Sequence, residues 1–241
     1  MLQSPRNLRH PSYHSARTGC RIATRLICWP GCWGDESKEE ETVIMQDPYP
    51  RFLLWVDAVG GFLVCTNDRV ELGRAVPGTT VDVPVFGDLS RRHAKIWRED
   101  GQYVIEPTQQ VSLNGEPIDQ PALLTDGAKI VLGSKVEFTF HKSHALSATA
   151  RLDFQSRHRT QPSADAILLM AESCVLGPRM KNHIVCQDWT QDLVLYRQAD
   201  DLYCQASGPI EIDDRQFDRR GKLGWNSHVS GSEFALSLER V

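Results

Sequence analysis

The 241-residue chain has little of what marks several common classes of protein. Its formal net charge is −4, so the basic excess of a general nucleic-acid-binding protein is missing. It also has no apolar run near the roughly 18 residues that a membrane-spanning helix needs. The longest apolar runs, such as Phe52–Val56 and Ile167–Ala171, have the length of strands. We therefore expect neither a nucleic acid nor a membrane as a partner.

The cysteines do not form a disulfide framework, because they are odd in number and irregularly spaced. Cys20, Cys28 and Cys32 lack the CxxC spacing of zinc sites, and only His10 or His14 could supply a fourth ligand. We expect no metal and no cofactor. The other four lie singly in apolar stretches, where a reduced thiol behaves as a small hydrophobic side chain: Cys65, Cys174, Cys186 and Cys204. This usage indicates a reducing, cytoplasmic location.

Acidic residues are missing from Met1–Gly34, which instead carries Arg6, Arg9, Arg17, Arg21 and Arg25. The weak periodicity predicts a low-order tail over residues 1–48, basic at first and acidic from residue 35 to 41. A transit peptide is one alternative, since such leaders are rich in Arg and Ser and poor in acids. A start of translation at Met45 is another.

Helical periodicity is missing from Arg51 onward, where short strand patterns alternate with turn signals. Asp100-Gly101 and Asn114-Gly115 are typical hairpin turns, and Asp126-Gly127 separates two further apolar runs. Short strands at regular spacing predict an all-β fold built as a β-sandwich. The strand patterns fall at residues 51–56, 62–66, 69–72, 81–85, 94–97, 103–105, 130–132 and 136–140.

The second half of the chain echoes the first. Residues 166–177 resemble residues 62–73, and residues 229–232 resemble residues 131–134. The glycines in these segments have similar offsets, 177 − 73 = 104 and 231 − 133 = 98, as duplication with short deletions would give. We therefore predict two tandem β-sandwiches after the tail, at residues 49–143 and 148–241.

Three groups of polar residues fall at strand ends or turns: Gly73-Arg74, Ser90–Ala94 and Thr108–Gly115. A phosphate carries close to two negative charges near neutral pH, and the planar fork of arginine matches its geometry. Two guanidinium groups and a hydroxyl from separate loops therefore predict an oxyanion-binding rim. Ser90 and His93 lack the orienting third group and the oxyanion hole of a catalytic serine, so we expect no enzymatic activity.

This ordered set resembles a forkhead-associated (FHA) domain, a β-sandwich that binds phosphothreonine. The resemblance covers roughly Arg51–Lys142 and rests on Gly73-Arg74, Ser90-Arg91-Arg92-His93-Ala94, Asn114-Gly115 and the closing Asp126–Gly133. It implies that Arg74, Ser90 and Arg91 contact the phosphate or the peptide that carries it. It also implies that Gly73, His93, Asn114 and Gly115 support the site structurally.

One turn departs from the family pattern. Where the family has Thr-Asn-Gly-Thr, with its Asn against the peptide, this chain has Thr108-Gln109-Gln110-Val111. Gln109 keeps the amide, so the resemblance implies that Thr108 and Gln109 contact the peptide. In the second half, Pro178 follows the corresponding glycine, and residues 187–193 contain no Ser-Arg-x-His. The second sandwich is therefore predicted to lack a phosphate site.

The sequence thus predicts a non-enzymatic adaptor in kinase signalling that binds a phosphothreonine segment of a partner protein. The altered Thr108-Gln109-Gln110 turn and the empty second copy favour an alternative, a phospho-independent interaction or assembly scaffold made of tandem FHA-like sandwiches. The two interpretations differ on whether Arg74→Ala removes binding. The sequence does not indicate an oligomeric state.

Overall fold

The structure, a computed structural model, describes residues 50–143 and 147–241. These residues form 22 strands. Within the same ranges there is no helix, and so no helix that could span a membrane. The tail, the acidic run, Met45 and the zinc candidates Cys20, Cys28 and Cys32 lie outside the described residues.

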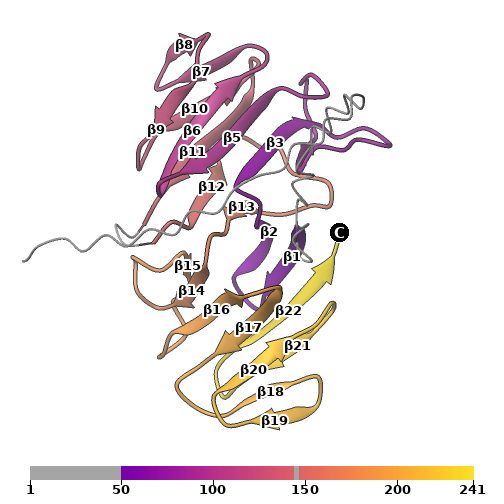
Figure 1. The fold of residues 1–241 in the computed structure, drawn as a ribbon, viewed down its shortest axis with the longest axis vertical. Coiled ribbons are helices and arrows are strands. Elements are labelled where there is room, and N and C mark those ends of the chain that lie inside the picture. Colours follow the sequence, from indigo (N-terminus) through magenta and orange to yellow (C-terminus); the bar gives the residue numbers. More distant parts are fainter. Residues whose placement is uncertain (1–49, 144–146) are drawn as a thin grey trace, which may run out of the picture. The chain divides into compact units, whose positions relative to one another are not determined.

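Each half of the chain supplies the same succession of strands (Figure 1). The first half contains β1 Arg51–Val56, β2 Gly60–Cys65, β3 Arg69–Arg74, β4 Val83–Val85, β5 Ala94–Glu99, β6 Gln102–Pro107, β7 Val111–Leu113, β8 Glu116–Ile118, β9 Ala122–Leu124, β10 Lys129–Leu132 and β11 Val136–His141. The second contains β12 Ala150–Phe154, β13 Ala166–Leu169, β14 Ser173–Gly177, β15 Ile184–Val185, β16 Leu193–Gln198, β17 Asp201–Gln205, β18 Ile210–Ile212, β19 Arg215–Phe217, β20 Arg220–Leu223, β21 His228–Ser230 and β22 Ala235–Arg240.

The strands form two β-sandwiches that share one sheet. The two five-stranded sheets have matching orders, β4-β3-β5-β6-β9 and β15-β14-β16-β17-β20. A 12-stranded sheet, β19-β18-β21-β22-β1-β2-β13-β12-β11-β10-β7-β8, supplies the second layer of both sandwiches. The predicted all-β sandwich fold is confirmed by this arrangement.

The two halves exchange a hairpin within the shared sheet. β11 pairs with β12, so that Phe140 lies opposite Leu152, and β22 pairs with β1. β2 and β13 then meet in parallel, with Leu63 opposite Ile167. The first sandwich is therefore completed by β12 and β13, and the second by β1 and β2. The boundaries 49–143 and 148–241 stay a prediction, and the sheets show that strands from each side complete the other sandwich.

The strands at the centre of the shared sheet are buried on both faces, because a core lies on each side. Leu53 and Leu63 belong to the core of the first sandwich, whereas their neighbours Leu54 and Val64 belong to that of the second. Strands buried on both faces have near-continuous apolar sequences, which explains the unbroken runs that cover β1, β2 and β13. Each such Leu or Val contributes about 1.5–3 kcal/mol on burial, so these strands bind the halves together.

Several local features follow from turn chemistry and side-chain hydrogen bonds. Asn114 and Gly115 have φ values of 54° and 92°, as a type I′ hairpin turn requires. The strand pattern at 81–85 forms only the shorter β4, because Asp82 turns its carboxylate to the N–H of Glu71, at 2.8 Å. The N–H of Glu71 is thus bound by the Asp82 side chain and not by a backbone carbonyl oxygen of a longer β4.

Four cysteines of the described residues are buried free thiols: Cys65, Cys174, Cys186 and Cys204. Burial raises the pKa of Cys186 to about 11 and that of Cys204 to about 12. It also raises the pKa values of Cys65 and Cys174 well above the usual range. These thiols are therefore uncharged at neutral pH and pack as small hydrophobic side chains.

Candidate functional site

A surface depression of about 400 Å³ lies where four loops of the first sandwich meet. The loops follow β3, β4, β6 and β10, and all four end at the same edge of the sandwich. We term this depression the first rim. It is lined by Arg74, Asp88, Leu89, Ser90, His93, Gln109, Gln110, Gly133 and Ser134.

Gly73 and Arg74 end β3 at the first rim. The N–H of Arg74 donates to the carbonyl oxygen of Ser90 at 2.9 Å, which holds the β4–β5 loop against the strand. A Cβ at Gly73 would overlap the carbonyl oxygen of Arg91. Only glycine permits this close approach of two backbone segments. Gly73 therefore sets the distance between Arg74 and Ser90.

His93 is buried and ties the loops together. Its Nδ1 accepts the N–H of Ser90 at 3.2 Å, and its Nε2 lies 2.8 Å from the carbonyl oxygen of Gln110. Nε2 also lies 3.0 Å from the backbone nitrogen of Gly133, so the same ring reaches the β10–β11 loop. The carbonyl oxygen of His93 also accepts the N–H groups of Thr108 and Gln109, both at 3.0 Å. One residue thus fixes the β4–β5 loop against the β6–β7 loop.

Three of the predicted phosphopeptide-binding residues line the first rim together: Arg74, Ser90 and Gln109. The Arg74 guanidinium, the Ser90 hydroxyl and the Gln109 amide make no side-chain hydrogen bond or ion pair with any described residue. A guanidinium group, a hydroxyl and an amide in one hollow are donors that an oxyanion can use. Asp88 is the acid among the lining residues, and its carboxylate would oppose anion binding.

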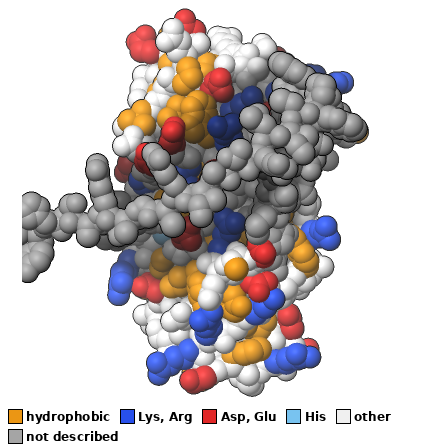
Figure 2. Space-filling model, in the orientation of Figure 1, with side chains coloured by type: hydrophobic (Ala, Val, Ile, Leu, Met, Phe, Trp, Pro, Cys, Tyr) orange, Lys and Arg blue, Asp and Glu red, His pale blue; other side chains and the backbone are white. Residues whose placement is uncertain are grey.

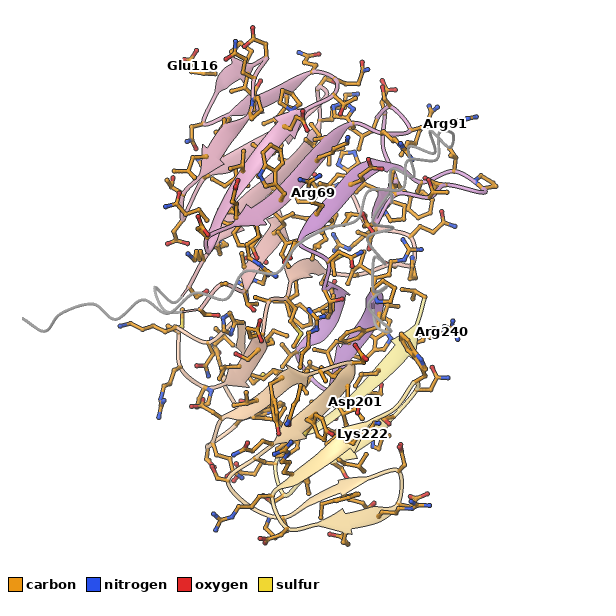
Figure 3. All side chains as sticks on the ribbon, in the orientation of Figure 1. Arg69, Arg91, Glu116, Asp201, Lys222 and Arg240 are labelled. Atoms are coloured by element: carbon orange, nitrogen blue, oxygen red, sulfur yellow. The ribbon has the colours of Figure 1, made fainter. Side chains whose placement is uncertain are left out.

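The other two predicted contact residues, Arg91 and Thr108, lie outside this lining. Arg91 is exposed, and Figure 3 shows it at the outer edge of its loop. Its neighbour Arg92 pairs with Glu71 at 3.2 Å and is therefore occupied. Thr108 contributes its backbone N–H to His93. Arg91 and Thr108 could contact only a ligand that extends beyond the depression.

Asn114 and Gly115 form the β7–β8 turn, at the end of β7 away from the first rim. The N–H and Oδ1 of Asn114 bond to the backbone of Lys129 at 2.8 and 2.9 Å. Figure 3 shows Glu116, the next residue, on the opposite side of the sandwich from Arg91. The Asn114-Gly115 turn thus holds β7 and β8 to β10 and does not line the first rim.

The sequence motifs did not single out the remaining lining residues, Asp88, Leu89, Gln110, Gly133 and Ser134. The β10–β11 loop enters the first rim because the N–H of Gly133 donates to Gln110 at 2.9 Å. The carbonyl oxygen of Asp88 also packs close to Gly133. The echo of Gly133-Ser134 in the second half marks this turn as a repeated feature, and that echo is the signal that could have found it.

In the second sandwich, side chains of the corresponding loops bond to one another. Asp192 occupies the position that corresponds to His93. Asp192 directly precedes Leu193, which pairs with Leu176, and His93 directly precedes Ala94, which pairs with Leu72. Its carboxylate accepts the amide of Asn182 at 2.7 Å and pairs with Arg179 at 3.1 Å. Arg179, the cation that follows Gly177-Pro178, is therefore paired with a carboxylate of its own sandwich.

A second carboxylate, that of the exposed Glu233, lies in the β21–β22 loop. It accepts the N–H and the hydroxyl of Thr190 at 3.0 and 2.5 Å. These two hydrogen bonds hold the pKa of Glu233 below its usual value. Figure 2 also shows acidic and basic side chains interspersed over the visible face of the second sandwich, with no basic surface there.

Residues 70–133 match the family model of the FHA domain, and the match includes Gly73-Arg74, Ser90, His93 and Asn114-Gly115. The chain contains an FHA domain. FHA domains are phosphothreonine-binding modules that mediate protein interactions. The sheet order of the second sandwich repeats that of the FHA domain without its motif residues. None of the curated proteins matches the chain.

Several solved FHA domains are similar to parts of the chain. The FHA-2 domain of an ABC transporter from Mycobacterium tuberculosis is 23% identical, over 37% of this chain and 76% of that one, with a TM-score of 0.29. The FHA domain of a Chlamydia trachomatis protein is 26% identical, over 35% and 90%, with a TM-score of 0.27. The N-terminal FHA domain of EssC, a component of the bacterial Type VII secretion apparatus, is 10% identical over 78% and 92%, with a TM-score of 0.22.

Proposed function

We propose that this chain is a non-enzymatic, cytoplasmic adaptor in kinase signalling and that its FHA domain binds a phosphothreonine segment of a partner protein. One observation carries the proposal. Arg74, Ser90 and Gln109 come from three loops, line one depression and leave their side-chain donors unused by any described residue. Gly73 and His93 hold these loops in place through backbone packing and hydrogen bonds.

The expected affinity follows from the number of charged contacts. A hydrogen bond to a charged group contributes about 1.5–3 kcal/mol net. Two or three such contacts on one phosphate, with a few backbone bonds, give about −8 kcal/mol, a dissociation constant of about 1 μM. An unphosphorylated threonine lacks the nearly two negative charges and the acceptor oxygens on which these contacts depend. Discrimination therefore comes from the charge that a kinase adds.

Calorimetric titration of the full chain tests the proposal. A degenerate phosphothreonine peptide library first identifies a binding sequence, and that peptide is then compared with its unphosphorylated twin. We expect about micromolar affinity for the phosphopeptide and at least about 30-fold weaker binding of the twin. Ser90→Ala removes the hydroxyl donor and should weaken the phosphopeptide about tenfold.

Ser232→Ala is the matched control, because Ser232 is an exposed serine in the β21–β22 loop of the second sandwich. It should leave the affinity unchanged. Equal binding of the phosphopeptide and its twin to the unaltered chain would refute the proposal.

A phospho-independent interaction or assembly scaffold is the second candidate. It is favoured by the second sandwich, in which Asp192 and Glu233 already occupy the donors that a ligand would need. This function predicts a partner that stays bound after phosphatase treatment and after Arg74→Ala. Co-purification of one partner under both conditions distinguishes the two functions, since a phosphothreonine adaptor would lose it in each case.

A further inference from the structure

Because of the hairpin exchange, each sandwich receives a connecting loop from the other half of the chain. In the second sandwich, the short β1–β2 turn Asp57–Val59 lines a depression of about 400 Å³ together with Asp188 and Glu233. This turn is acidic and reaches the second sandwich only because β1 pairs with β22. By the same exchange, the long β12–β13 loop, residues 155–165, belongs to the first sandwich.

The β12–β13 loop runs along the free side of β4, beside the loop that carries Ser90. The N–H of Phe86 donates to the carbonyl oxygen of Arg159 at 2.9 Å. Two residues further on, the N–H of Gln161 donates to Pro84 at 2.8 Å. The ring of His158 packs against Gly87, where an added Cβ would lie 3.2 Å from its Cδ2. These contacts fix the loop directly behind Asp88, which lines the first rim.

The start of the same loop is fixed to β11. The N–H of Gln155 donates to the carbonyl oxygen of Glu137 at 2.9 Å, and the N–H of Glu137 donates to the hydroxyl of Ser156 at 3.2 Å. Glu137 lies just after the β10–β11 loop, whose residues Gly133 and Ser134 line the first rim. The β12–β13 loop is therefore anchored to the two loops that form this side of the rim.

Charged side chains of both signs lie on this side, and two of the cations have no charged partner among the described residues. Arg157 and Lys135 are exposed and make no ion pair or side-chain hydrogen bond with any described residue. Arg159 is partly occupied, because its guanidinium donates to the His158 carbonyl oxygen at 3.0 Å and lies 3.8 Å from Asp165. Two exposed acids also lie on this side, Glu137 in β11 and Asp88 in the rim lining, and neither forms an ion pair with Arg157 or Lys135.

We propose that Arg157 and Lys135 form a basic wall beside the first rim and select phosphothreonine segments that carry acidic side chains next to the phosphothreonine. This inference rests on the proposed function and names the partner chemistry of the same site. The hairpin exchange supplies half of the wall, since Arg157 lies in the β12–β13 loop. The acidic β1–β2 turn beside the depression of the second sandwich would repel such a segment.

The test uses the full chain and three peptides of one length. The first has phosphothreonine with Asp or Glu on both sides, the second has phosphothreonine with Ala and Ser instead, and the third has the acidic residues around unmodified threonine. At about 50 mM salt we expect the acidic phosphopeptide to bind about three- to tenfold more tightly than the neutral one, since each exposed pair adds a small increment. At about 300 mM salt the difference should shrink, because the screening length shortens.

The double variant Arg157→Ser/Lys135→Ser should remove the preference and leave the neutral phosphopeptide within about twofold of the unaltered chain. Arg215→Ser is the matched control: Arg215 is exposed and lies in β19, at the far end of the shared sheet from β8. It should keep the preference. Circular dichroism of each variant checks that its strands are retained.

Each failure has its own signature. Equal affinity for the two phosphopeptides, or a preference that survives the double variant, overturns the basic wall and leaves phosphothreonine binding intact. If neither phosphopeptide binds better than the unmodified one, the proposed function fails and the basic wall fails with it.

Discussion

The first rim and the corresponding loops of the second sandwich are built alike, and they differ in whether their hydrogen-bond donors are free of other described side chains or already paired with them. In the first sandwich, Arg74 and Ser90 leave their side-chain donors unused by any described residue. In the second, Arg179 pairs with Asp192, and Thr190 bonds to Glu233. The second sandwich thus keeps the scaffold, and carboxylates from its own loops bind these donors. Two sandwiches with the same order of strands can therefore present loops whose donors are free of described partners in one and paired with acids in the other.

The largest expected effect comes from comparing one arginine of each sandwich, Arg74 and Arg179. Arg74→Ala should weaken a phosphothreonine peptide about 10- to 100-fold, because it removes charge-assisted hydrogen bonds of about 1.5–3 kcal/mol. Arg179→Ala should leave the affinity unchanged, since that guanidinium serves Asp192. Calorimetry with one phosphopeptide compares the variants. An equal loss in both would mean that the ligand spans the two sandwiches.

The paired glycines sharpen the comparison at the level of the backbone. A methyl group at Gly73 meets the carbonyl oxygen of Arg91, whereas one at Gly177 meets side-chain atoms of Asp192 and Asn182. Overpacking of this kind costs about 1–3 kcal/mol, which lowers the melting temperature of a chain this size by about 2–10 °C. We expect both Ala variants to melt earlier.

Only Gly73→Ala should also weaken the phosphopeptide, by at least about tenfold, because it moves Ser90 away from Arg74. Melting curves and titrations on the same samples separate the two effects. A Gly73→Ala variant with normal affinity would show that the β4–β5 loop need not touch β3.

A contiguous fragment tests the hairpin exchange itself. Residues 67–171 contain β3 to β13, which form the first sandwich except for the Leu53 and Leu63 side chains that β1 and β2 add to its core. This fragment should unfold cooperatively and bind the phosphopeptide within about twofold of the full chain. It should be less stable, because the first core loses Leu53 and Leu63, and because Leu168 and Met170 lose the second core. A fragment that fails to fold would indicate that β1 and β2 are needed in the first sandwich.

The smallest effect concerns the Glu233 carboxylate. Its pKa is lowered in the folded chain, so its contribution to stability is present above the unfolded pKa of about 4.3 and is lost as the pH falls through the lower folded value. Glu233→Gln should therefore lose less stability than the unaltered chain between pH 7 and pH 3. Thermal melts across this range measure the difference, and Thr190→Val should reproduce it. An unchanged pH profile would show that the Thr190 bonds contribute nothing.

The strands and the chemistry of the first rim could be predicted from local patterns. Alternating Val136, Phe138 and Phe140 fix a strand with one buried face, and Asn114-Gly115 fixes a hairpin. The ordered motif brought Arg74, Ser90 and Gln109 together before any contact was known. It did not separate Arg91, which lies outside the lining, from these three, because a motif gives loop membership and not side-chain direction.

The hairpin exchange could not be predicted in this way. β11 offers the same edge to β1 and to β12, and both candidates have apolar residues at alternate positions, such as Leu54 and Leu152. Pairing between them is decided by packing over the whole sheet, which no local pattern records. The unbroken runs in β2 and β13 were the available signal, since they imply burial on both faces.

The pairing of β1 with β22 has a mechanical consequence. Phe52 lies opposite Arg240 in an antiparallel ladder, so the first and last strands leave the shared sheet at the same place. Tension applied at these two points would open the ladder one hydrogen bond after another, like a zipper, instead of shearing all of them at once. Under load, β1 would therefore leave the second sandwich first, while β12 still paired with β11 in the first sandwich.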